Sequence, residues 1–201
     1  MADRLRVGVL LSGSGTNLQA ILDATGTDYE VSLVLSDKAD APGLDRARTA
    51  GVPAVHVDPK PFGGRDEFNA ALVEALRAHD VELVCLAGFM RILAPNFVRA
   101  FENRILNVHP ALLPAFPGGH AVADALAWGA KVTGTTVHIV DEEVDHGPVV
   151  LQEAVAIEPG DTEETLHERI KVVEHRLYPE AIRLFAAGRV KIEGRSVHIL
   201  D

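Results

Sequence analysis

The sequence contains a single cysteine, Cys85, and only 5% of its 201 residues are aromatic. No disulfide can form within the chain, which is typical of proteins from a reducing compartment, so we expect a cytoplasmic protein. A core with few aromatic rings must be built largely from aliphatic side chains and alanine. A chain of this length can bury enough of them to fold without cross-links, and we predict one domain over residues 1–201.

Long apolar runs are also missing from the sequence. No stretch approaches the roughly 20 apolar residues that are needed to cross a bilayer, so we expect no membrane partner. The first residues, Met1 to Arg4, do not begin the apolar segment of a secretory signal.

Positive charge is scarce, because 19 lysines and arginines stand against 29 acidic residues and give a formal net charge of −10. Such a field repels phosphate backbones, and we therefore expect no nucleic-acid partner. A small phosphorylated substrate is still compatible with this charge. It would need local donors, such as the backbone amides at the start of a helix.

Short apolar runs alternate with stretches of helical periodicity through the first half of the chain. The alternation predicts an α/β fold, a mostly parallel twisted sheet flanked by helices, with a Rossmann-like N-terminal half over about residues 1–108. The predicted strands are 6–11, 31–35, 52–57, 83–87 and 105–108. Helices are expected after the first strand, at 43–50 and from about Asp66 to His79.

The second half of the chain, about residues 109–201, changes character. Segments 132–140 and 148–157 predict longer, hairpin-like strands and hence an antiparallel extension. A long helix is expected from near Asp161, with Glu164 completing a capping box. Pro179 lies within its apolar periodicity and should bend or interrupt it.

A glycine-rich turn joins the first strand to the first helix. Glycine allows close backbone approach to a ligand, and the helix start offers free N–H groups, so the turn predicts a phosphate site of mononucleotide type. A dinucleotide fingerprint would need glycine at Leu18, and a Walker A loop would need a lysine. The alternative is a turn of small residues that only lets strand and helix pack. The turn consists of Ser12, Gly13, Ser14, Gly15, Thr16 and Asn17.

Asn107 and His109 lie at the carboxyl end of a predicted buried strand, where open parallel sheets gather their ligand sites. Alternation places both side chains on one side of the strand, so an amide and an imidazole can point at one developing oxyanion. The alternative is a capping asparagine and a histidine satisfied within the core.

An acidic turn follows the strand that ends near residue 140. It contains Asp141, Glu142, Glu143, Val144 and Asp145, and most of its carboxylates fit a solvated surface. Asp145 differs because His146, Gly147 and Pro148 follow it and fix a tight turn. A carboxylate against His109 would favour the imidazolium form. The acidic spacing is not that of an EF-hand and the histidines lack zinc-like grouping, so no metal is expected.

Four segments of the chain resemble, in order and spacing, the phosphoribosylglycinamide formyltransferase family of folate-dependent enzymes in purine synthesis. The resemblance covers nearly the whole chain, from the first strand to the last helix, and it implies a formyltransferase fold. The segments are Gly13–Ala20, Leu86–Leu93, Asn107–Pro114 and Val144–Pro148.

The resemblance implies transfer of the formyl group of 10-formyltetrahydrofolate, the co-substrate, to the amine of 5′-phosphoribosylglycinamide on the route to IMP, without a metal. It gives the catalytic roles to Asn107, His109 and Asp145. It implies that the Gly13–Asn17 loop and Glu174 bind the phosphate and ribose of the substrate, with Lys171 as a weaker match. The folate-binding residues that it implies are Arg65, Met90, Arg91, Ile92, Leu93, Asn107, Asp141, Glu142, Glu143, Val144 and Asp145.

Two positions depart from the family pattern. Gly119 stands where a larger residue is common, and His146 stands where a small one is common. Neither change removes a catalytic group, although Gly119 could loosen the loop beside the substrate. The mechanism that the resemblance implies uses Asp145 to keep His109 protonated. A monomer and a homodimer both fit the sequence.

Related enzymes offer two alternatives. A formyltetrahydrofolate deformylase-like hydrolase would use a similar site to pass the formyl group to water. Such enzymes carry an additional N-terminal regulatory domain, whereas the first strand here begins by residue 6. A methionyl-tRNA formyltransferase would need a C-terminal RNA-binding extension, whereas this acidic chain ends at Asp201. We therefore expect transfer to the small amine.

Two further alternatives belong to other classes. A non-catalytic mononucleotide-binding module could share the glycine-rich turn, but it would have no need of the amide, imidazole and carboxylate. A nicotinamide dehydrogenase could use Asp37, near the end of the second strand, to reach a ribose. Leu18 in the position of the third glycine weakens that reading.

Overall fold

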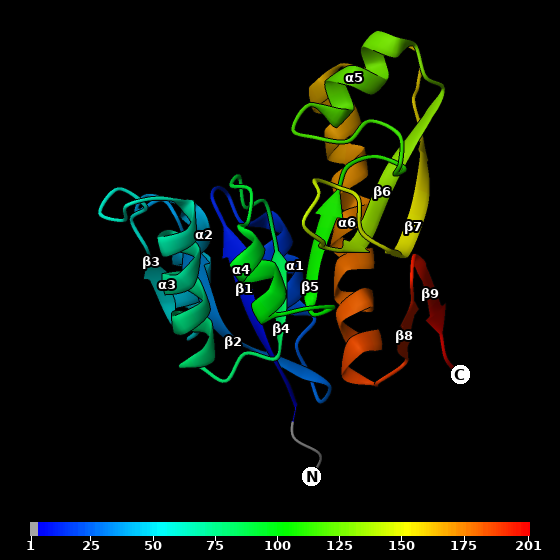
Figure 1. Ribbon diagram of the computed structural model, residues 1–201. Helices are drawn as coiled ribbons and strands as arrows, with labels where there is room; N and C mark the ends of the chain where they lie inside the picture. Colours follow the sequence, from blue (N-terminus) through cyan, green and yellow to red (C-terminus); the bar gives the residue numbers. More distant parts are fainter. Residues whose placement is uncertain (1–3) are drawn as a thin grey trace. The chain divides into compact units, whose positions relative to one another are not determined.

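The computed structural model describes residues 4–201 and divides into two compact units, Met1–Leu106 and Asn107–Asp201 (Figure 1). The boundary falls within the strand Ile105–His109, close to the predicted change of character near residue 108. One domain over residues 1–201 stays a prediction. The prediction that the chain does not begin with a secretory signal concerns Met1 to Arg4, and residues 1–3 lie outside the described residues.

Seven strands form one sheet in the order β3-β2-β1-β4-β5-β6-β7, and two more form the hairpin β8-β9. β1 is parallel to β2 and β4, and β2 is parallel to β3, whereas β6 and β7 are antiparallel. The predicted α/β fold, with a parallel N-terminal half and an antiparallel extension, is confirmed. The strands are β1 Leu5–Leu11, β2 Tyr29–Ser36, β3 Ala54–His56, β4 Leu83–Leu86, β5 Ile105–His109, β6 Val132–Ile139, β7 Val149–Ala156, β8 Val190–Glu193 and β9 Ser196–Ile199.

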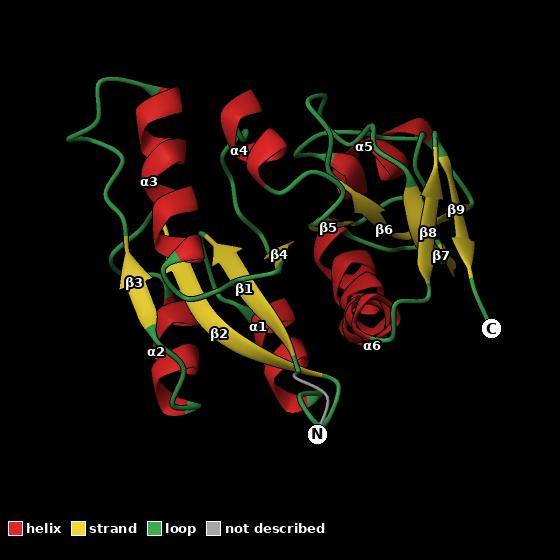
Figure 2. Ribbon diagram, turned by 60° about the horizontal axis from the view of Figure 1, so that its bottom comes forward, coloured by secondary structure: helices red, strands yellow, loops and turns green. Residues whose placement is uncertain are grey.

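Helices alternate with the parallel strands in the first unit, as the periodicity predicts. In that unit α3 and α4 lie side by side (Figure 2). The helices are α1 Thr16–Asp23, α2 Pro42–Thr49, α3 Arg65–Arg77, α4 Pro95–Ala100, α5 Ala121–Trp128 and α6 Glu163–Ala186. Among residues 4–201, none of these helices is long and apolar enough to cross a membrane.

The core of the first unit requires close approach of α3 to β1. Leu72 and Leu76 on α3 are fully buried, as are Val7 and Val9 on β1. A Cβ on Gly8 would lie 2.5 Å from Cδ2 of Leu76, which is closer than real side chains come. The missing side chain at this position therefore sets how closely the helix packs on the strand.

In the second unit, α6 packs against β6 and β7 through a continuous apolar face (Figure 1). Leu166 and Ile170 are fully buried and form a cluster with Val122 of α5 and Val155 of β7. This packing holds the long helix against the hairpin strands in the predicted way.

The capping box of α6 differs from the sequence prediction, and of the two effects predicted for Pro179 only the interruption is excluded. The capping box consists of Thr162 and Thr165, one residue later than the predicted pair of Asp161 and Glu164. The hydroxyl of Thr165 performs the role expected of a carboxylate, because it reaches back to the N-cap amide. Pro179 lies inside the helix but does not interrupt it, since the helix continues to Ala186. Burial of the surrounding turn outweighs the loss of one backbone hydrogen bond.

The β8-β9 hairpin is absent from the sequence prediction. Each of its strands has four residues, and most of their side chains are exposed or half-buried. Such short strands carry too little apolar alternation to be recognised from the pattern.

We predict that Gly8→Ala lowers the free energy of unfolding by about 1–3 kcal/mol, the usual cost of overpacking a filled core. The matched control is Gly26→Ala, because a Cβ at Gly26 would meet no atom within 4 Å. Denaturant unfolding of both variants measures the difference. Equal stabilities would show that α3 moves freely enough to accept the added methyl group.

Candidate active site

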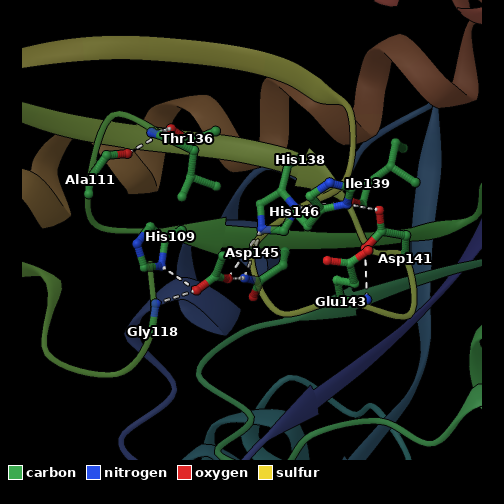
Figure 3. Close-up of polar contacts among 12 residues, drawn as sticks. His109, Ala111, Gly118, Thr136, His138, Ile139, Asp141, Glu143, Asp145 and His146 are labelled. Carbon is green, nitrogen blue, oxygen red and sulfur yellow. Dashed lines mark hydrogen bonds and ion pairs between the residues drawn. The ribbon is translucent and has the colours of Figure 1, made fainter. Parts of the chain in front are cut away.

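His109 is the last residue of β5 and is 4% exposed. Its Nε2 lies 2.8 Å from the carbonyl oxygen of Phe116, and because a carbonyl only accepts, Nε2 carries a proton and donates it. Its Nδ1 lies 3.4 Å from Oδ2 of Asp145 (Figure 3). The imidazole is therefore fixed at one nitrogen and faces a carboxylate with the other.

Asp145 receives hydrogen bonds on both carboxylate oxygens. The backbone N–H of Gly118 donates to Oδ2 at 2.7 Å, and Nδ2 of Asn107 donates to Oδ1 at 3.4 Å. The backbone of Asp145 has φ 51, a left-handed conformation that costs a residue other than glycine of order 1–3 kcal/mol. The strained turn places the carboxylate at the end of β5. A functional requirement for the carboxylate at this position would explain the strain.

Burial has the largest single effect on the pKa values of His109 and Asp145. The pKa of His109 lies below its ordinary value of 6.5 because burial disfavours the imidazolium, and the charge of Asp145 and the bond to Phe116 offset only part of this. Burial alone would raise the pKa of Asp145. Interactions with the His138 ring, the Gly118 amide and His109 outweigh it, so that pKa lies below 3.8. Burial therefore opposes the expected protonation of His109, whereas Asp145 favours it, and the role of Asp145 stays a prediction.

His138 on β6 belongs to the site, although the sequence analysis does not single it out. Its side chain is 2% exposed, and its Nδ1 donates to the carbonyl of Ile139 at 2.9 Å. Nε2 is therefore the acceptor for Nδ2 of Asn107 at 3.1 Å. This bond fixes the rotation of the Asn107 amide. The only available sequence signal is one histidine inside an otherwise buried strand.

The acidic turn is held in place from two directions. Oδ1 of Asp141 accepts from the amide of Glu143 at 3.0 Å, and Oδ2 accepts from Nδ1 of His146 at 2.7 Å (Figure 3). Arg195, in the turn between β8 and β9, donates to the carbonyl of His146 at 2.6 Å and to its Nε2 at 3.1 Å. His146, a departure from the family pattern, therefore connects the turn to the C-terminal hairpin.

The glycine-rich turn lies in the first unit and has its carbonyls directed onto α2. The carbonyl of Gly13 accepts from the amide of Gly43 at 3.1 Å, and that of Ser14 accepts from Nε of Arg46 at 2.8 Å. Gly15 has φ 71 and a Cβ there would lie 2.7 Å from Cα of Gly43, so only glycine fits. With the carbonyls engaged, the amides of the first turn of α1 suit an anion.

The folate wall, by which we mean the predicted folate-binding residues Met90, Arg91, Ile92 and Leu93, also lies in the first unit. Met90 is 73% exposed and Ile92 is 60% exposed, which leaves two neighbouring apolar side chains in solvent. Nε of Arg91 donates to Oδ2 of Asp37 at 2.7 Å. Leu93 is buried and belongs to the core beneath this segment, whereas Arg65 is exposed at the start of α3.

One reading of the sequence, the free carboxylate at Asp37, changes with these contacts. Glu174 is buried on α6, and Lys171 forms an ion pair with Glu168. Asp37 accepts from Oγ of Ser12 as well as from Arg91, so both of its oxygens are engaged and it does not offer a free carboxylate to a ribose. Within residues 4–201, no three metal-binding side chains gather into a group that could hold an ion.

The profile of the formyl transferase family matches residues 5–182. The chain is 48% identical over 198 residues to a phosphoribosylglycinamide formyltransferase of Mycobacterium tuberculosis, covering 95% of this chain and 89% of that protein. It is 49% identical over 193 residues to the trifunctional purine biosynthetic protein adenosine-3 of Gallus gallus, covering 94% of this chain but only 19% of that protein.

A solved structure agrees with these sequence matches. The crystal structure of glycinamide ribonucleotide transformylase 1 from Symbiobacterium toebii has a TM-score of 0.98 and 57% identity, with 100% of this chain and 96% of that chain covered. The family model that the chain matches is that of formyl transferases, which are group-transfer enzymes. The chain belongs to the formyl transferase family.

We predict that Arg195→Ala speeds hydrogen exchange at the amide of Glu143 by about three- to tenfold, the equivalent of one or two lost hydrogen bonds. The matched control is Lys191→Ala, because Lys191 lies on the same hairpin and pairs only with Glu193 in the described contacts. Exchange followed by mass spectrometry checks this. Unchanged exchange in Arg195→Ala would show that the acidic turn keeps its structure without the hydrogen bonds from Arg195.

Proposed function

We propose that this chain transfers the formyl group of 10-formyltetrahydrofolate to the amine of 5′-phosphoribosylglycinamide, a step of purine synthesis. One observation carries the proposal: the carboxylate of Asp145 lies 3.4 Å both from the amide of Asn107 and from the imidazole of His109. This group occurs in a chain that closely resembles named phosphoribosylglycinamide formyltransferases.

Asn107 stabilises the charge that develops on the formyl oxygen. The neutral substrate amine attacks the formyl carbon, a C–N bond forms, and the carbonyl electrons move to oxygen. The amide of Asn107, whose rotation His138 fixes, donates to this oxyanion. One N–H of Asn107 stays bonded to His138, and the other leaves its long 3.4 Å contact with Asp145 to meet the oxyanion, so the amide needs little reorientation when the charge appears.

His109 moves the proton that the reaction releases. In the neutral form that burial favours, its unprotonated Nδ1 faces Asp145 at 3.4 Å, so the proton of the attacking nitrogen reaches Nδ1 by way of that carboxylate, which then stabilises the imidazolium. The same proton passes to the folate nitrogen as its bond to the formyl carbon breaks. The products are the formylated amine, which is now a formamide, and tetrahydrofolate, and no covalent enzyme intermediate is required.

The remaining residues bind the two substrates. The Gly13–Asn17 loop binds the substrate phosphate through amides at the start of α1, and Glu174 contacts the ribosyl part. The exposed Met90 and Ile92, with Arg91 and Arg65, bind the reduced folate together with the Asp141–Asp145 turn. A cytoplasmic location and a monomeric or homodimeric state complete the proposal.

The rival reaction is hydrolysis of 10-formyltetrahydrofolate by water. An absorbance assay for tetrahydrofolate, run with and without phosphoribosylglycinamide, separates the two. The proposal requires product formation only when the acceptor is present. Product formation at the same rate without the acceptor would establish the hydrolase instead.

We predict that Asp145→Asn lowers kcat by roughly 10²–10³-fold, the usual loss when a group that stabilises transition-state charge is removed. Binding of tetrahydrofolate should change little, because the loop contacts of Asp141 remain. The control is Asp124→Asn, an exposed carboxylate on α5. Steady-state kinetics with both variants would disprove the role if Asp145→Asn kept wild-type kcat.

We predict that His109 titrates below pH 6.5 in the free protein, since burial outweighs the attraction of Asp145. The folded chain then binds fewer protons at this site than the unfolded chain, so this contribution to stability is present above pH 6.5 and is lost as the pH falls through the folded pKa. An NMR titration of the His109 Cε1 proton, assigned with His109→Gln, measures the value. In Asp145→Asn it should fall further, and a value above 6.5 would contradict the neutral-base mechanism.

A further inference from the structure

Asp37 follows the last residue of β2 and is buried, although it carries a charge. Its side chain is 3% exposed. A buried carboxylate is costly unless it is paired and hydrogen-bonded, so a position of this kind indicates a specific requirement for its partners.

Both oxygens of Asp37 engage segments that the proposed function uses. Oγ of Ser12 donates to Oδ1 at 2.6 Å, and Nε of Arg91 donates to Oδ2 at 2.7 Å. Ser12 opens the glycine-rich turn, and Arg91 belongs to the folate wall. One carboxylate therefore bonds to the segments proposed for the two different substrates.

The hydroxyl of Ser12 closes the network. While it donates to Asp37, it accepts from the amide of Met90 at 2.9 Å, and the amide of Ser12 donates to the carbonyl of Gly88 at 3.0 Å. β2, β1 and β4 are adjacent parallel strands, so their carboxyl ends meet at one edge of the sheet. Asp37 lies at this edge beside both segments.

Arg91 is held in a defined orientation by these contacts. Its guanidinium lies over the ring of Phe68, with its carbon 5.6 Å from the ring centroid, while Nε is bonded to Asp37. With 45% of its side chain exposed, the guanidinium still presents surface to a ligand. Loss of the carboxylate would free this long side chain to adopt several rotamers.

We propose that Asp37 is a positioning residue, which fixes Arg91 and Met90 for the folate and, through Ser12, holds the start of the phosphate loop. This inference rests on the proposed function. It assigns Asp37 no contact with either substrate.

The test compares Asp37→Ala with Asp37→Asn. Alanine removes both acceptors, and we expect KM for 10-formyltetrahydrofolate to rise about tenfold or more, with a smaller change in kcat, because a hydrogen bond to a charged group is among the stronger ones. Asparagine keeps one acceptor oxygen and should recover part of the loss. Asp45→Ala is the control, since that carboxylate is 78% exposed and pairs only with Arg48 in the described contacts.

Calorimetric titration with tetrahydrofolate separates the outcomes, because it reports the folate wall without the transfer reaction. Weaker binding in Asp37→Ala, restored in part in Asp37→Asn, supports the positioning role. Unchanged KM and unchanged binding overturn it, as does a fall in melting temperature and kcat with KM unaltered, which is the signature of a purely structural residue.

A second variant keeps the test decisive if Asp37→Ala does not fold. Ser12→Ala retains the carboxylate and its bond to Arg91 but breaks the connections of Asp37 with the loop and with Met90. We expect KM for phosphoribosylglycinamide to rise, and an unaltered KM overturns the coupling. If the wild-type chain transfers no formyl group yet binds tetrahydrofolate, and the variants change that binding as expected, the proposed reaction fails while the role of Asp37 survives.

Discussion

The bond between the amide of Gly118 and the carboxylate of Asp145 is the contact on which the candidate site depends. It is short, at 2.7 Å, and it holds a residue whose backbone adopts a left-handed conformation. Asn107 and His109, which β5 positions, both face this fixed carboxylate at 3.4 Å. Because the surroundings are largely buried, each of these polar contacts is stronger than it would be in water.

The same burial sets the chemistry that the group can perform. An imidazole in water would be partly protonated near neutral pH, whereas burial here lowers the pKa of His109 and favours the base. A carboxylate close by does not reverse that preference in the free protein. In the proposed mechanism the carboxylate acts when His109 gains a proton, because it then stabilises the positive charge on the ring.

The sequence predicts the sheet well because buried strands and amphipathic helices leave clear periodicities. It also predicts Asn107 and His109 as candidates, because polar residues at the carboxyl end of a buried parallel strand are unusual. Their assignment to catalysis, like that of the other site residues, stays a prediction. The capping residue of α6 is misplaced by one position because Asp161 and Thr162 are neighbours and both are favoured N-cap residues.

The features that sequence reasoning misses depend on contacts between distant segments. His138 contacts Asn107, which lies 31 residues away in the sequence, and Arg195 contacts His146, which lies 49 residues away. Neither residue lies in a recognisable motif, so its importance appears only when the partners are brought together. The lowered pKa of His109 is not visible in the sequence for a related reason: the sequence shows the neighbouring charge but not the burial that opposes it.

The exposure of Met90 and Ile92 has a thermodynamic consequence for the free protein. Two apolar side chains, 73% and 60% exposed, order water around them for as long as no ligand covers them. A pterin that covers both would release this water, and the heat capacity of the complex would then lie below the sum of its components. The enthalpy of association would accordingly grow more favourable on warming, while the entropy would grow less favourable. Enthalpy would then supply an increasing share of the binding free energy.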